Sequence, residues 1–115
     1  MVRVELSPNG SFNVSEFGTV MDADEFQAIY KYSPYHRVKD GTHYASVLFL
    51  TGANDPRVDP VHSRNMTARL QAATGRPDQM LLRTSVAAGH GLGTALSEVI
   101  EQDVDVYTFL FAKLV

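Results

Sequence analysis

The stretch SVLFLTGANDPRV, residues 46–58, decides how this chain folds. Its first half belongs to a near-continuous apolar run without alternation, which is typical of a strand buried on both faces of a parallel sheet. Gly52 ends the run, and Asp55 follows in a loop. The pattern therefore predicts a buried strand over about residues 44–52, with a carboxylate just beyond its end.

A second apolar run, MLLRTSV, predicts a parallel partner strand at about residues 79–86. It leads into a loop in which His90 stands between two glycines. Between the strands, Asp59 is a candidate N-cap with Pro60 at the first helical position, which predicts a helix over about 60–74. Gly75 is expected to end this helix. Strand, helix and strand form a βαβ unit, whose crossover should be right-handed.

Two further helices are predicted on either side of this unit. Asp22 offers an N-cap, with Glu25 three positions later as in a capping box, so one helix should cover about 22–31. Pro34 stops it, because the residue before a proline avoids the helical region. The last helix should cover about 94–112. The predicted fold class is therefore α/β, with two main parallel strands among helices.

The composition sets the class of protein. The chain has 115 residues, 44% of them apolar, a net charge of −3 and no cysteine. This suits a single globular domain without disulfides. Basic residues are scattered, which argues against a nucleic-acid partner, and no apolar run is long enough to cross a membrane. No signal peptide is recognised, so a cytoplasmic or a periplasmic location remains open.

Asp55 and His90 are the candidate chemical pair. Both follow the carboxyl ends of adjacent parallel strands, where side chains can meet and ligands bind. A carboxylate that accepts a hydrogen bond from one imidazole nitrogen leaves the other nitrogen as a base. Acid followed by histidine is also the chain order of α/β-hydrolase triads. On spacing alone the alternative stays open, since an aspartate after a strand is often only a turn residue.

Several strings together resemble one family. They are similar to the C-terminal end of the prolyl oligopeptidase family of serine peptidases, over essentially all of residues 1–115. The resemblance implies a single partial α/β-hydrolase domain without a propeller, namely the last two strands of the hydrolase sheet and the helices around them. The strings are PNG at 8–10, EFG at 16–18, YSPY at 32–35, LTGANDPRVDP at 50–60, HS at 62–63 and AGHG at 88–91.

The resemblance also implies roles for individual residues. Asp55 matches the triad acid and His90 the triad base. Arg57 matches an arginine that holds a substrate carbonyl near the scissile bond, and the alternative for it is a loop residue that pairs with Asp59. The implied partner is a proline-containing peptide substrate, and no cofactor is expected.

The implied proline pocket is only partly matched. Val58 and Phe17 match its apolar lining. At Asn13, however, the family often carries a tryptophan that stacks on the proline ring. One half of the pocket therefore departs from the family pattern.

The largest departure from the family pattern is the lack of a serine in the nucleophile motif. No serine of this chain has glycines two positions before and two after it, and the oxyanion tyrosine and the gating propeller are also missing; the serines are at positions 7, 11, 15, 33, 46, 63, 85 and 97. Because triad members act as a unit, the chain is predicted to be a fragment of a proline-specific serine endopeptidase, inactive alone, that contributes the acid, the base and part of the substrate pocket.

Two other functions compete with this one. The first is a non-catalytic self-associating or binding module that retains a relic acid–histidine pair. Open strand edges and exposed helix faces predict self-association or docking to the missing N-terminal part of the hydrolase domain. The second is a metal site, which is disfavoured because no two histidines share ligand spacing on one element; they are His36, His43, His62 and His90.

Overall fold

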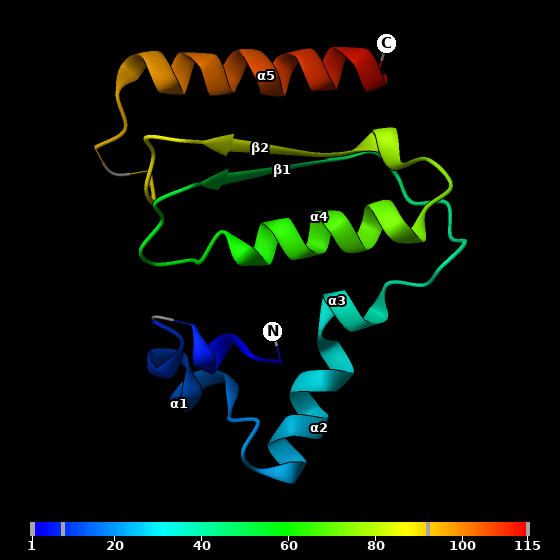
Figure 1. The fold of residues 1–115 in the computed structure, drawn as a ribbon, viewed down its shortest axis with the longest axis vertical. Helices are drawn as coiled ribbons and strands as arrows, with labels where there is room; N and C mark the ends of the chain where they lie inside the picture. The colour runs from blue at the N-terminus through cyan, green and yellow to red at the C-terminus, as the bar shows by residue number, and fades with distance from the viewer. Residues whose placement is uncertain (1, 8, 92, 115) are drawn as a thin grey trace.

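A computed structural model of the chain describes residues 2–7, 9–91 and 93–114. Its elements lie in a broad, thin arrangement of 45 × 39 × 17 Å. In Figure 1 the C-terminal helix, the two strands and one long helix are stacked from top to bottom, with the N-terminal third below them. The described helices and strands are α1 (Val14–Phe17), α2 (Ala23–Tyr32), α3 (Pro34–Arg37), β1 (Val47–Gly52), α4 (Val61–Ala73), β2 (Met80–Ser85) and α5 (Leu96–Leu114).

The two strands pair in parallel, as predicted. Their register runs from Val47 opposite Met80 to Gly52 opposite Ser85. The predicted start at residue 44 was too early, because β1 begins only where it meets a partner. On the other strand the chain is still in a short 3₁₀ turn, Pro77–Gln79, before the ladder starts. The carboxyl ends of both strands therefore finish level with each other.

Helix α4 closes one face of this sheet. Met80 is fully buried there, and it packs with Leu70 and Ala73 of α4 and with the nearby Val38. From β1, Phe49 reaches the same cluster. Burial of apolar side chains is the main favourable contribution to folding, so this face holds the packed centre of the molecule.

The ends of α4 partly match the prediction. The carboxylate of Asp59 accepts a hydrogen bond from the backbone N–H of Val61 at 2.9 Å. The N-cap position itself is Pro60 and not Asp59, because the helix starts one residue later than expected. Gly75 was expected to end the helix but does not have a left-handed conformation. Thr74 leaves the helix in an extended conformation while its N–H still bonds to the Leu70 carbonyl. An extended residue therefore ends α4 without a glycine cap.

Helix α2 begins as the sequence predicted. The Asp22 carboxylate accepts hydrogen bonds from the N–H groups of Asp24 and Glu25, both at 3.0 Å. The Glu25 side chain does not return to Asp22 but accepts from the N–H of Thr19 at 2.7 Å. In place of the reciprocal hydrogen bond of a capping box, Glu25 therefore binds the backbone of the preceding turn. The helix ends at Tyr32, just before the Ser-Pro pair.

The N-terminal segment contains several short helical turns. Two 3₁₀ turns, Val4–Leu6 and Gly10–Asn13, precede the short helix α1. The side-chain amide of Asn9 donates to the carbonyl of Pro56, which joins this segment to the loop after β1. Pro8, which belongs to one of the family-like strings, lies outside the described residues.

Helix α5 lies on the opposite face of the sheet from α4 and is attached mainly by one arginine. Arg83 of β2 contacts Glu98 at 3.2 Å and Asp105 at 2.6 Å. Hydrogen bonds from this arginine to the two carboxylates, first to Asp105, outweigh burial and raise the pKa of Arg83. No described residue of α5 is fully buried. The helix therefore rests on the sheet chiefly through charged contacts.

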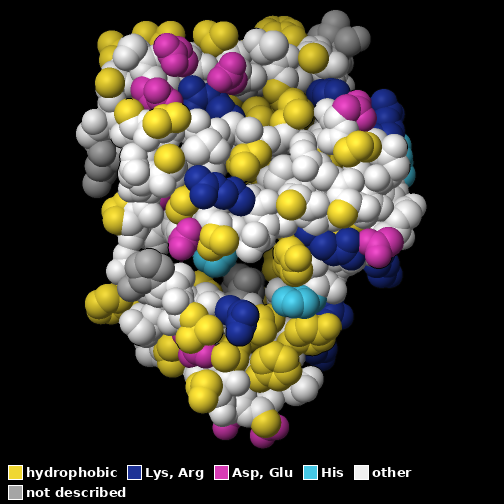
Figure 2. Space-filling model, in the orientation of Figure 1, with side chains coloured by type: hydrophobic (Ala, Val, Ile, Leu, Met, Phe, Trp, Pro, Cys, Tyr) yellow, Lys and Arg dark blue, Asp and Glu magenta, His cyan; other side chains and the backbone are white. Residues whose placement is uncertain are grey.

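The outer side of α5 carries an exposed apolar stripe, which Figure 2 shows along the top of the molecule. Each member of the stripe is more than half exposed; the residues are Leu96, Ile100, Val104, Tyr107, Phe111 and Leu114. Contiguous apolar surface of this kind marks a contact face. None of the described helices combines the length and the apolar character needed to cross a membrane.

We expect Arg83→Ala to loosen α5 while leaving the α4 side intact. Losing hydrogen bonds to two partly exposed carboxylates should cost about 1–2 kcal/mol after solvent screening, which is at least about a fivefold change in local opening. Amide hydrogen exchange should therefore accelerate in α5 and stay unchanged in α4. Arg64→Ala, at an exposed position of α4, is the control. Equal acceleration in both helices would contradict this assignment.

Candidate active site

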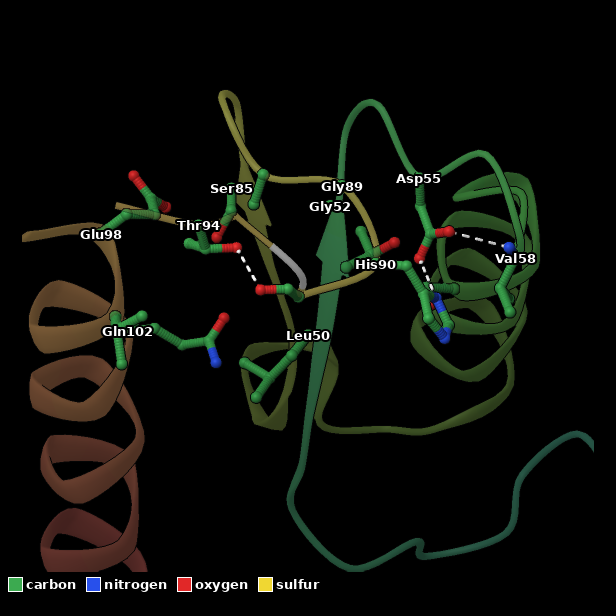
Figure 3. A pocket seen from close by; sticks show the side chains of 15 residues that line it. Leu50, Gly52, Asp55, Val58, Ser85, Gly89, His90, Thr94, Glu98 and Gln102 are labelled. Carbon is green, nitrogen blue, oxygen red and sulfur yellow. Dashed lines mark hydrogen bonds and ion pairs between the residues drawn. The ribbon is translucent and has the colours of Figure 1, made fainter. Parts of the chain in front are cut away.

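Asp55 lies in a loop that folds back onto its own carboxylate. One carboxylate oxygen, Oδ1, accepts hydrogen bonds from the backbone N–H groups of Arg57 at 2.8 Å and Val58 at 2.9 Å. The other oxygen, Oδ2, lies 2.8 Å from Nδ1 of His90, as Figure 3 shows. The Asp55 side chain is only 11% exposed. The loop thus orients the carboxylate independently of its histidine partner.

The environment keeps Asp55 ionised. Burial alone would raise its pKa, but hydrogen bonds from the Val58 N–H, from His90 and from the Arg57 N–H outweigh burial and lower the pKa below its ordinary value. An ionised carboxylate can only accept hydrogen bonds. The network therefore assigns the proton to Nδ1 of His90 and leaves Nε2 with a lone pair. A histidine in this tautomer can take up a proton at Nε2.

Glycines let the two loops approach each other closely. Gly91 and Gly93 both have left-handed backbone conformations, with φ of 88° and 76°, which a side chain would disfavour. At the end of β1, a Cβ added to Gly52 would lie 2.4 Å from the carbonyl oxygen of Gly89 and 2.5 Å from that of Ala88. The contact between the loops therefore requires a glycine at position 52.

Backbone and side-chain hydrogen bonds continue the sheet ladder into the loops. The N–H of Ala53 bonds to the Ser85 carbonyl at 2.9 Å, and the N–H of Asn54 to the Ala88 carbonyl at 3.3 Å. The side-chain amide of Asn54 donates to the carbonyl of Val86 at 2.8 Å. Sequence reasoning missed this role of Asn54. Its only signal was an amide residue directly before the candidate acid.

A cavity of about 400 Å³ opens at the ends of the strands. In Figure 3, Asp55, His90 and Val58 lie on one side of β1. Polar side chains from the start of α5 and the turn before it lie on the other side; they are Thr94, Glu98 and Gln102. His90 is 37% exposed, so its imidazole is accessible from this cavity.

The predicted pocket residues are not all brought together. Val58 lines the cavity and is 49% exposed. Arg57 contributes its backbone N–H to Asp55, and its side chain is exposed. Phe17, 42% exposed, and Asn13 lie on the N-terminal segment and do not line this cavity. The structure therefore groups Val58 with the acid–histidine pair, whereas Phe17 and Asn13 are not part of the lining of this cavity.

The hydroxyl group of Ser85 is hydrogen-bonded to the neighbouring side chains of Arg83 and Glu98. Ser85 is 3% exposed and accepts a hydrogen bond from Arg83. Its own hydrogen bond to Glu98 is the largest influence on that carboxyl group and, with Arg83, lowers the pKa of Glu98. Among the described residues, no group of three histidine or acidic side chains is placed to hold a metal ion. Asp55 and His90 therefore remain the candidate chemical pair of this cavity.

Comparison with known proteins identifies relatives of the whole chain. Residues 5–115 match the sequence profile of the peptidase S9, prolyl oligopeptidase family. The chain is 36% identical over 115 residues to the prolyl endopeptidase of Elizabethkingia miricola, covering 99% of this chain and 16% of that protein. It is 36% identical over 117 residues to the prolyl endopeptidase of Dictyostelium discoideum, covering 99% of this chain and 15% of that protein. It therefore spans a small part of these relatives' length.

Solved structures agree with the sequence comparison. A structure from a study of two prolyl endopeptidases superposes on 99% of this chain with a TM-score of 0.92 and 38% identity, using 17% of its own chain. A second structure is prolyl oligopeptidase B from Galerina marginata, as a serine-to-alanine variant bound to a 35-residue hydrolysis and macrocyclisation substrate. It superposes with a TM-score of 0.86 and 26% identity, covering 99% of this chain and 16% of its own. The α/β arrangement is thus that of a piece of a prolyl endopeptidase hydrolase domain.

We expect Asp55 to titrate below its ordinary pKa of 3.8, as followed by the ¹³C shift of its carboxyl group. Because the folded-state pKa is lowered, the stabilising contribution of the carboxylate is present above 3.8 and is lost as the pH falls through the folded value. His90→Ala removes one lowering hydrogen bond, so the pKa of Asp55 should rise in that variant. His43→Ala, at an exposed loop position, should leave it unchanged. An unchanged pKa in His90→Ala would contradict the contact.

Proposed function

The chain belongs to the prolyl oligopeptidase family of serine peptidases, and we propose that it supplies the acid and the base of that family's catalytic triad. The observation that carries the proposal is the 2.8 Å contact between Asp55 Oδ2 and His90 Nδ1. The nucleophilic serine is supplied by a part of the catalytic domain outside these residues. By itself the chain is therefore inactive as a peptidase.

The proposed chemistry follows from the proton positions at the pair. His90 Nε2 takes the proton of the serine hydroxyl as its oxygen attacks the scissile carbonyl, and Asp55 stabilises the resulting imidazolium. The same imidazolium then donates its proton to the leaving amine. Asp55 remains ionised throughout, because its hydrogen bonds favour the carboxylate.

The proposed substrate is a peptide with proline at the cleaved position. Val58 lies in the cavity beside His90 and offers apolar surface to the proline ring. Arg57, two residues after the acid, is proposed to hold a substrate carbonyl. Phe17 and Asn13 are proposed to complete the pocket from the N-terminal segment, which reaches the loop after β1 through Asn9.

A chimeric enzyme tests this function. The matched 115 residues of the Elizabethkingia miricola prolyl endopeptidase are replaced by this chain, and cleavage of a chromogenic proline amide is measured. We expect activity in the chimera and a loss in kcat of about 10⁴-fold or more on His90→Ala or Asp55→Asn, since triad members act as a unit. His43→Ala is the matched control and should retain activity.

Two results would overturn the proposal. One is a chimera that folds, as judged by circular dichroism, but does not cleave the amide. The other is an active chimera in which His90→Ala retains full activity. The isolated 115-residue chain should show no cleavage in the same assay.

A second proposal concerns association, and the exposed apolar surface favours it. Within the described residues β1 pairs with β2 alone, so each of these strands has one edge without a partner strand there. The outer stripe of α5 is also uncovered. We therefore propose that the chain docks to the rest of a hydrolase domain or, without it, associates with a second copy.

Sedimentation velocity tests this association. We expect the isolated chain to sediment as a dimer or larger species, and Phe111→Lys on the α5 stripe to shift it toward the monomer, because a charge there opposes apolar contact. Thr108→Lys, which places the same charge at another exposed position of α5, is the control. A wild-type chain that stays monomeric at its highest soluble concentration would argue against self-association.

A further inference from the structure

The loop that carries His90 is joined to other segments by few hydrogen bonds. Among the described residues, the hydrogen bonds that join positions 86–90 to other segments all involve Asn54 or Asp55. Asn54 supplies two of them, a backbone bond of 3.3 Å to the Ala88 carbonyl and a side-chain bond of 2.8 Å to the Val86 carbonyl. The remaining one is the contact between Asp55 and His90. Apart from that pair, the Asn54 amide is the only side chain in the described part of the chain that holds this loop by a hydrogen bond.

We propose that Asn54 is a positioning residue, whose side-chain amide fixes the direction in which the His90 loop leaves β2 and so keeps the imidazole within reach of Asp55. This inference rests on the proposed function of the pair. Val86 is the first residue after β2, so a bond to its carbonyl acts where the loop separates from the sheet. A small change of direction at that point is carried through the following residues to His90.

The chemistry of asparagine suits this position. Its amide nitrogen is a donor that matches a backbone carbonyl, whereas an aspartate at neutral pH could only accept. Being uncharged, it adds no like charge beside Asp55, which would raise the pKa of that carboxyl group. Gly52 assists, because its missing side chain allows the Gly89 carbonyl to come close. Together these two residues set the spacing between the loops.

The isolated 115-residue chain allows a direct test by NMR. In the wild type, a coupling across the hydrogen bond should connect the Asn54 side-chain nitrogen with the Val86 carbonyl carbon. The low-field proton signal of His90 Nδ1 should be present as well. Asn54→Ala should remove that low-field signal and raise the pKa of Asp55, whereas Asn65→Ala, at an exposed position of α4, should change neither.

Asn54→Asp tests whether this position needs a hydrogen-bond donor or only a side chain of this size. It keeps the size of asparagine but cannot donate, so the His90 Nδ1 signal should be lost here too. Retention of the signal in both Asn54 variants, or absence of the coupling in the wild type, would overturn the proposal. Because Asn54 is exposed, the fold should persist in both variants, which circular dichroism checks.

The chimeric enzyme provides a kinetic readout that a merely structural role would not give. Asn54→Ala should lower kcat by up to about 100-fold, the size expected for a misplaced catalytic group, and should leave KM nearly unchanged. Equal kcat in the variant and the parent would refute the positioning role. An inactive parent chimera would instead count against the proposed function, and the NMR result on the isolated chain would still decide the role of Asn54.

Discussion

The parallel pairing of β1 with β2 is the constraint on which the rest of the structure depends. The ladder places Gly52 level with Ser85, so the loops that carry Asp55 and His90 start from neighbouring points. Side chains alternate along a strand, and a slip of one residue would turn every side chain to the other face. Such a slip would take Met80 out of the buried cluster. It would also shift the starting points of the two loops relative to each other. Core packing and site geometry are therefore set by the same register.

The two faces of the sheet contribute unequally. The α4 face is closed by apolar packing around the fully buried Met80. The α5 face is held mainly by the contacts of Arg83 with Glu98 and Asp105, and the cavity beside His90 extends toward this side. Segments with few buried apolar contacts open more readily than packed ones. The His90 loop thus lies between a rigid face and a looser one.

Local signals predicted most of the framework. Apolar runs, the Asp22 cap and the order of elements follow from interactions between residues close in sequence, and the expectation that Asp55 and His90 meet follows from parallel strand ends. The bond from Asn54 to Val86, by contrast, depends on which carbonyl lies opposite in three dimensions. The ending of α4 at Thr74 instead of Gly75 is another choice that propensity alone could not determine. The placement of Phe17 outside the cavity likewise depends on the path of the N-terminal segment.

The acid and the base are positioned by different means. Asp55 receives two backbone hydrogen bonds from its own loop, so its carboxylate keeps its direction whether or not a histidine is present. Among the described residues, His90 receives no hydrogen bond from within its own loop, and its anchors come from the other strand end. Gly91 beside it is in a left-handed conformation. The acid is therefore the fixed reference of the pair and the histidine is the adjustable member. In a site of this design, the geometry of the pair depends less on the carboxylate itself than on the contacts that bring the second loop to it.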